Sequence, residues 1–201
     1  MEQNLVIGID VGGQTTKCGV VDARGTVLAQ TVIRSDSYTT VEPYIEELAA
    51  ALKKIITDAG AEGQIRGIGV GAPNANYYTG EVENAVNLSW GRAGSIPFAK
   101  MLTEAMGGIP VTLTNDANAA AMGEMTYGAA RGMKNFIMIT LGTGLGSGFV
   151  ANGEMVYGHD GFAGEFGHVI VERNGRECGC GRRGCLETYV SATGIKRTAF
   201  E

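Results

Sequence analysis

Three of the four cysteines in this chain lie within eight residues, in the segment Cys178-Gly-Cys180-Gly-Arg-Arg-Gly-Cys185, and His168 stands ten residues upstream. Three thiolates and one imidazole make a complete tetrahedral ligand set for zinc, and the intervening glycines allow a loop tight enough for all four to reach one ion. A disulfide or unrelated reduced thiols are the alternatives, but Cys178 and Cys180 are poorly spaced to bond each other and three is an odd number. The sequence therefore predicts a structural zinc site with ligands His168, Cys178, Cys180 and Cys185.

Charge and apolar patterning exclude several classes of partner. The formal net charge is -5, and no basic cluster is longer than the Arg182-Arg183 pair, which an exposed, solvated face explains, so we expect no nucleic-acid partner. The N-terminus lacks the pattern of a signal peptide, and no apolar run approaches membrane-spanning length. We expect a soluble, cytoplasmic protein with no membrane partner, in which Cys18 is a small buried hydrophobe.

The order of predicted elements indicates an α/β fold. Apolar runs and turn residues predict an antiparallel meander, and from Val41 the apolar residues recur at helical spacing, with Thr40 as a candidate cap and Gly60 beyond the end. The predicted strands are 5–9, 17–21, 26–33, 68–70, 111–113 and a second meander from 136, and the predicted helices are 41–56, 98–106 and 117–125. Both meanders share the layout strand, glycine loop, strand, turn, strand, which suggests two similar lobes that each present a glycine loop.

The first glycine loop spans Asp10 to Lys17. Its backbone N–H groups, hydroxyls and amine suit phosphate oxygens, which makes Gly12, Gly13, Thr15 and Lys17 candidate phosphate ligands. A plain hairpin turn is the alternative reading. Asp10 could hold Mg²⁺ through water or simply hydrogen-bond its own turn.

The second glycine loop is predicted over 142–148. Its alternating glycines would expose consecutive backbone N–H groups, with Gly142, Thr143 and Gly144 as candidate phosphate ligands. It fits neither the P-loop nor the dinucleotide pattern, since no Gly-Lys-Ser/Thr ending and no following helix is present. Two such loops favour a nucleoside triphosphate.

Polar residues at strand and loop ends form a candidate sugar site. Asn115 and Asp116 stand where a strand ends and a helix begins, as residues aimed into a cleft or as an N-cap pair. An ionised Asp116 can orient a hydroxyl and accept its proton late in phosphoryl transfer. Glu165, His168 and Glu187, gathered near the metal loop, could accept hydrogen bonds from sugar hydroxyls, although solvated surface charges remain the alternative for the carboxylates.

Five motifs, in this order, resemble the ROK family of sugar kinases and repressors. They are Asp10-x-Gly-Gly13, Asn115-Asp116-Ala-Asn118, Gly142-Thr-Gly144, Ala163-Gly-Glu165-x-Gly-His168 and Cys178-x-Cys-Gly-x-x-Gly-Cys185-x-Glu187. The resemblance implies an actin-like, ribonuclease-H-like ATPase fold of two lobes whose mixed sheets are flanked by helices. It also implies transfer of the ATP γ-phosphate to a hexose, most often to the 6-hydroxyl of glucose.

The family's roles map onto this chain by motif position. The resemblance implies Asp116 as the catalytic base, and ATP, Mg²⁺ and structural zinc as cofactors; homodimers are common in the family. It implies that hexose hydroxyls are gripped by Asn87, Asn115, Glu165, His168 and Glu187. It places the first phosphate loop and part of the sugar site in an N-terminal lobe, 1–116, and the second loop and zinc motif at the start of a C-terminal lobe, 117–201.

The chain departs from the family pattern in three places. Gln14-Thr15 and Ala72-Pro73-Asn74 replace commoner sequences in the phosphate and sugar loops. Family members usually run to about 300 residues, the size of two full lobes, so we expect an incomplete second lobe and exposed apolar surface. A sugar-sensing repressor and a sugar-binding module without kinase activity are the alternative functions, although no room for a DNA-reading helix precedes the first loop.

Overall fold

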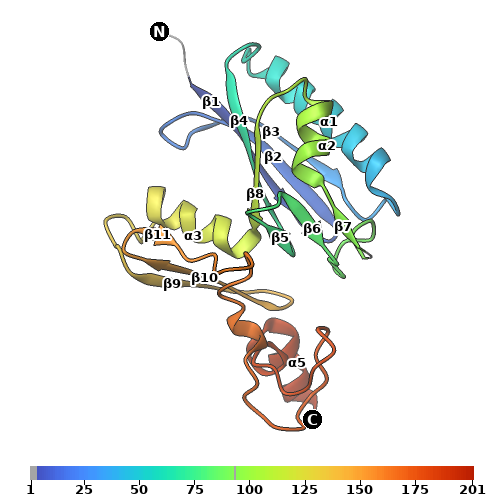
Figure 1. The fold of residues 1–201 in the computed structure, drawn as a ribbon, viewed down its shortest axis with the longest axis vertical. Helices are drawn as coiled ribbons and strands as arrows, with labels where there is room; N and C mark the ends of the chain where they lie inside the picture. Colours follow the sequence, from blue (N-terminus) through green and yellow to red (C-terminus); the bar gives the residue numbers. More distant parts are fainter. Residues whose placement is uncertain (1–3, 93) are drawn as a thin grey trace. The chain divides into compact units, whose positions relative to one another are not determined.

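The computed structural model describes residues 4–92 and 94–201, and the chain divides into two compact units, Met1–Asp116 and Ala117–Glu201. Figure 1 shows the elements of each unit.

The first unit is built on a five-stranded mixed sheet in the order β3-β2-β1-β4-β8. Its strands are β1 (Leu5–Val11), β2 (Thr15–Val21), β3 (Val27–Arg34), β4 (Ile65–Ala72) and β8 (Val111–Asn115). The first three form the predicted antiparallel meander, while β4 pairs parallel with β1 and β8 pairs parallel with β4. All five strands were predicted, and the structure extends each beyond its most apolar residues.

Two helices pack on one face of this sheet (Figure 1), α1 (Val41–Asp58) and α2 (Phe98–Ala105). The alternation of β1 is strict, with every second side chain buried, because one face of the strand meets the helices. Leu48 and Leu52 of α1 are fully buried, which stabilises the fold by about 1.5–3 kcal/mol each. Thr40 stands at the N-cap as predicted, but its side chain makes no capping hydrogen bond.

A small antiparallel sheet was not predicted from the sequence. It consists of β5 (Ala75–Asn76), β6 (Glu81–Glu83) and β7 (Ser95–Ile96), in the order β5-β6-β7. Strands of two or three residues carry no periodicity that a sequence pattern can show. The segment that contains Asn87 connects β6 to β7.

In the second unit a three-stranded antiparallel sheet, ordered β11-β10-β9, packs on α3 (Asp116–Tyr127). The strands are β9 (Phe136–Leu141), β10 (Leu145–Ala151) and β11 (Glu154–Met155), the second meander that the sequence predicts. Ile137, Ile139 and Leu141 of β9 are 46–61 % exposed, which agrees with the expectation of exposed apolar surface.

The predicted loop over 142–148 is wrong in its second half. Gly146 and Gly148 belong to β10 and pair with β9. A Cβ atom at Gly146 would lie 3.0 Å from the Ala117 Cβ, and one at Gly148 would lie 2.9 Å from the Ala121 Cβ. These two glycines therefore let α3 approach the sheet closely, and the loop that can expose N–H groups is 142–144.

The remaining chain holds three short helical segments, of which only a helical turn near His168 was considered from the sequence. They are the 3₁₀ turn η1 (Phe166–His168), α4 (Glu187–Val190) and α5 (Ala192–Phe200). Ser191 caps α5, since its side chain accepts a hydrogen bond from the Gly194 N–H. Among the helices that the structure describes, none has the length and apolar character needed to cross a bilayer.

Candidate functional site

The first glycine loop is shorter than predicted. Strand β1 runs to Val11 and β2 begins at Thr15, so the turn itself comprises only residues 12–14. Asp10 and Lys17 are exposed and lie opposite each other on the paired strands. They flank the turn on the sheet and do not stand within the loop.

The segment with Asn87 lies against this turn. A Cβ atom at Gly13 would stand 2.7 Å from the Asn87 carbonyl oxygen, so only glycine allows the approach. The structure thus brings together, within the first unit, one residue assigned to phosphate and one assigned to sugar. Asn115 ends β8 and Asp116 begins α3, as predicted, with the Asp116 side chain exposed.

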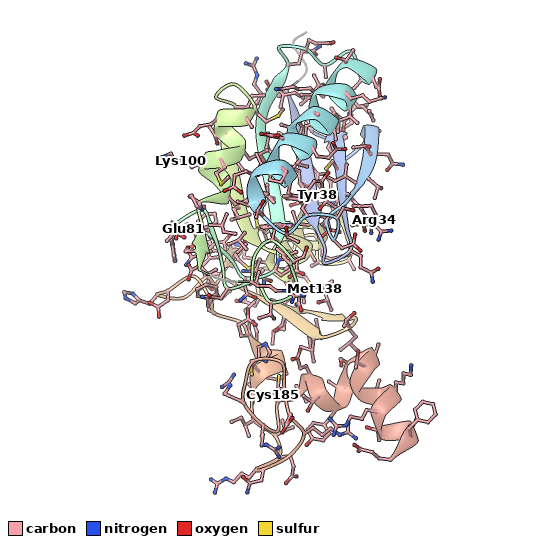
Figure 2. All side chains as sticks on the ribbon, turned by 90° about the vertical axis from the view of Figure 1, so that its right-hand side faces the viewer. Arg34, Tyr38, Glu81, Lys100, Met138 and Cys185 are labelled. Atoms are coloured by element: carbon pink, nitrogen blue, oxygen red, sulfur yellow. The ribbon has the colours of Figure 1, made fainter. Side chains whose placement is uncertain are left out.

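The four predicted metal ligands converge. One ligand atom from each of His168, Cys178, Cys180 and Cys185 lies within 4.8 Å of all the others. The Cys178 Sγ is 3.6 Å from the His168 Nδ1, and the Cys180 Sγ is 3.7 Å from the Cys185 Sγ, while all the thiols are free. Figure 2 labels Cys185 within this part of the chain.

These spacings fit a tetrahedral zinc ion. Zn–S bonds of about 2.3 Å and Zn–N bonds of about 2.0–2.1 Å at tetrahedral angles separate two sulfurs by about 3.8 Å, and a sulfur from a nitrogen by about 3.6 Å. Both separations are close to those in the structure. A disulfide, by contrast, needs its sulfurs about 2.05 Å apart.

The thiols of this cluster differ in acidity. Burial raises the pKa of Cys180, but hydrogen bonds from Arg182 outweigh burial and bring this pKa down to about 6. Burial raises the pKa of Cys178 and of Cys185, and the hydrogen bond from Cys178 to Glu187 raises the former further. Cys180 is therefore the most acidic of the three thiols, and the thiolate is the form that binds metal.

Glu187 links the cluster to the second glycine loop. Its Oε1 accepts a hydrogen bond from the Cys178 Sγ at 3.0 Å and lies 3.7 Å from the His168 Nδ1, whereas its Oε2 accepts one from the Leu145 N–H at 3.3 Å. The same Oε2 would be 2.7 Å from a Cβ at Gly144. The loop, the carboxylate and the cluster therefore share one small region.

Glu165 and His168 also lie near each other, as their spacing on a helical turn predicts. The His168 Nε2 is 3.9 Å from the Glu165 Oε2, and the Nδ1 faces Cys178. Since one ring nitrogen faces the sulfurs, the other is available on the carboxylate side. Cys18 is 3 % exposed, and burial, with the charge of Asp10, raises its pKa to about 12, which fits its predicted role as a buried hydrophobe.

Two arginines hydrogen-bond the backbone around the Cys/His cluster, which the sequence did not indicate. The Arg182 Nη2 donates to the His168 carbonyl at 3.0 Å, so this residue is not merely a solvated charge. Arg176 has a side chain 10 % exposed and donates to the carbonyls of Thr188 and Gly194, which ties the metal loop to α4 and α5. Arginine in a glycine-rich loop has no distinctive spacing, so pattern alone could not find this anchor.

The order of motifs and the converging ligands agree with comparisons to known proteins. The model of the ROK family matches residues 6–200. The chain belongs to the ROK family. A glucokinase from Halalkalibacterium halodurans is 40 % identical over 204 residues, which cover 100 % of this chain and 61 % of that protein.

The relatives of this chain include both sugar kinases and repressors. The structure of a ROK glucokinase from Streptomyces griseus in complex with glucose and AMPPNP aligns with a TM-score of 0.80 at 36 % identity, over 97 % of this chain and 60 % of that one. The fold is therefore the α/β, actin-like fold of ROK kinases. The xylose repressor of Bacillus subtilis is 31 % identical over 96 % of the chain and 49 % of the repressor. The chain thus spans about 60 % of the length of its kinase relatives.

Proposed function

We propose that this ROK protein is an ATP-dependent hexose kinase that phosphorylates glucose at its 6-hydroxyl. The observation that carries the proposal is the position of Glu187, between the second glycine loop and the Cys/His cluster. A phosphotransferase needs its acceptor beside the loop that holds phosphate, because positioning supplies much of the rate enhancement. The glucokinase relatives, at 36–40 % identity, support the same acceptor.

Asp116 takes the role of base in this mechanism. The oxygen of the sugar 6-hydroxyl attacks the γ-phosphorus, the bond to the β-γ bridging oxygen breaks, and ADP leaves with that electron pair. The hydroxyl proton passes to the Asp116 carboxylate. Because the transition state is loose, the proton is transferred late and a weak base is sufficient.

The other side chains bind and orient. Hydrogen bonds to the hexose hydroxyls come from Asn87, Asn115, Glu165, His168 and Glu187. Phosphate oxygens are held by N–H groups and side chains of the two loops, namely Gly12, Gly13, Thr15, Lys17, Gly142, Thr143 and Gly144, with Asp10 as a ligand for Mg²⁺ through water. Mg²⁺ supplies charge neutralisation on the phosphates.

The cysteines would hold zinc in a structural role. His168 would contribute Nδ1 to the ion, together with Cys178, Cys180 and Cys185. The ion would fix the imidazole tautomer and the position of Glu187, and would supply folding energy to a loop with few apolar contacts. The two-lobe assignment belongs to this proposal, with the first phosphate loop and part of the sugar site in residues 1–116 and the second phosphate loop and zinc motif in residues 117–201. The cytoplasmic location and the homodimer belong to it as well.

A coupled assay of ADP release across glucose, mannose, fructose, N-acetylmannosamine and xylose tests the proposal. We expect glucose to give the highest kcat/KM. Protein that binds zinc and ATP but turns over none of these sugars contradicts the kinase assignment.

A sugar-sensing repressor is the second candidate, because the xylose repressor of Bacillus subtilis is 31 % identical. The same sugar panel, titrated by calorimetry, separates the two functions. A repressor or binding module binds its sugar without releasing ADP, whereas the kinase does both.

A further inference from the structure

Ser35 donates hydrogen bonds to the backbone of the first glycine loop. This residue follows β3, is 1 % exposed, and donates through its Oγ to the Gly12 carbonyl at 2.5 Å. Its backbone N–H donates to the Gln14 carbonyl at 3.0 Å. Two of the three carbonyl groups of the loop, those of Gly12 and Gln14, therefore point toward one buried serine.

This arrangement sets the direction of the loop's donors. No peptide bond among the described residues is cis, and a trans peptide directs its C=O and N–H groups to opposite sides. With the Gly12 and Gln14 carbonyls directed at Ser35, the N–H groups of Gly13 and Thr15 are directed away from it. Those are N–H groups of residues that the proposed function assigns to phosphate.

The segment 87–90 touches the same loop from another side. The Asn87 carbonyl oxygen occupies the space that a Cβ at Gly13 would need. Two residues later, the Ser89 Oγ donates to the Tyr38 carbonyl at 2.6 Å and lies 3.5 Å from the Ser35 carbonyl oxygen. Tyr38 is labelled in Figure 2. Asn87, assigned to the hexose, is thus connected to Ser35 through three residues of chain.

The aromatic core makes a second connection between segment 87–90 and the first glycine loop. Trp90, the only tryptophan, stacks on Tyr44 with 4.7 Å between ring centroids and on Phe98 with 5.7 Å. The Tyr44 hydroxyl hydrogen-bonds the Oγ1 of Thr16 at 2.7 Å, and Thr16 is fully buried in β2 just after the loop. Side chains this tightly packed transmit a displacement because they cannot absorb it.

We propose that Ser35 is a positioning residue that couples hexose binding at Asn87 to phosphate binding by the first glycine loop. The inference rests on the proposed function and adds a regulation of the same site. A hexose that fixes segment 87–90 also fixes, through Ser89, the residue that aims the loop's N–H groups. Such coupling is reciprocal, so nucleotide binding raises hexose affinity by the same factor.

Calorimetry with AMPPNP and Mg²⁺, without glucose and at saturating glucose, tests the coupling. We expect glucose to raise the nucleotide affinity of the wild type by about fivefold or more. Ser35→Ala lowers nucleotide affinity in both conditions and removes the gain, while glucose affinity without nucleotide stays within about twofold. Ser89→Ala keeps the affinity without glucose but loses the gain. Ser37→Ala, an exposed serine of the same segment, keeps both.

The 201-residue chain offers a second readout that needs no nucleotide. Asn87 contacts Gly13 directly, so the informative amide is that of Thr15. In ¹H–¹⁵N spectra we expect glucose to shift the amide resonance of Thr15 in the wild type and in Ser37→Ala, but not in Ser89→Ala. A loss of thermal stability in Ser35→Ala with the glucose-dependent gain intact contradicts the inference, because that is the result of a purely structural role. An unshifted Thr15 amide in glucose-bound wild type contradicts it as well. Wild-type protein that binds no hexose contradicts the proposed function itself, and the inference with it.

Discussion

A methyl group added at Gly144 tests whether the second glycine loop sets the position of the Glu187 carboxylate. The new Cβ would stand 2.7 Å from the Glu187 Oε2, and ordinary contact begins at 3.4 Å, so the carboxylate must retreat by about 0.7 Å. The displaced atom is the end of a flexible side chain, and alanine also restricts the unfolded chain, so the free energy of unfolding should change by less than about 1 kcal/mol. We therefore expect Gly144→Ala to change the affinity for the ligand and not the stability of the fold.

The expected loss follows from the hydrogen bond that we propose Glu187 makes to a sugar hydroxyl. A hydrogen bond to a charged group contributes about 1.5–3 kcal/mol, so Gly144→Ala should weaken glucose binding about 10- to 150-fold by calorimetry. Gly142→Ala is the matched control for glucose affinity, because nothing lies within 4 Å of its Cβ position. Equal glucose affinity in the wild type and Gly144→Ala would refute the placement of Glu187, and so would equal losses in both variants.

Three further changes separate chemistry, metal binding and core packing. Asp116→Asn should lower kcat by about 10²–10⁴-fold in the ADP-release assay with glucose affinity nearly unchanged, and retained turnover would exclude Asp116 as the base. Cys185→Ser should lose stoichiometric zinc by elemental analysis, whereas Cys18→Ser should keep it, and equal zinc content in both would exclude the cluster. Leu48→Ala should destabilise by about 2–5 kcal/mol in denaturant unfolding, and a cost below about 1 kcal/mol would contradict its full burial.

The regular elements could be predicted because their apolar residues are periodic. The strict alternation of β1 and the helical spacing in α1 reflect burial on one face, and both elements appear where expected. The small sheet β5-β6-β7 could not be predicted, because its strands are too short to show a period. Its strands are joined by turns whose closure depends on tertiary contacts.

Glycine was the least informative residue in the sequence. Gly144 and Gly148 look alike in a run of alternating glycines. In the structure, however, Gly144 lies against the Glu187 carboxylate, and Gly148 allows close packing of α3 on the sheet. The metal cluster, by contrast, follows from ligand type and spacing, and its four ligand atoms converge. Ser35 carries no sequence signal, since its importance lies in two carbonyl groups 21 and 23 positions earlier in the chain.

We propose that a zinc-bound cluster holds His168 and Glu187 in the geometry that binds a hexose. Glucose titration by calorimetry, with elemental analysis of the same sample before chelation, after chelation and after zinc is restored, tests it most directly. We expect one zinc per chain, loss of glucose binding on chelation, and recovery with zinc. Glucose affinity that is the same with and without the metal, or freshly purified reduced protein without stoichiometric zinc, would contradict it.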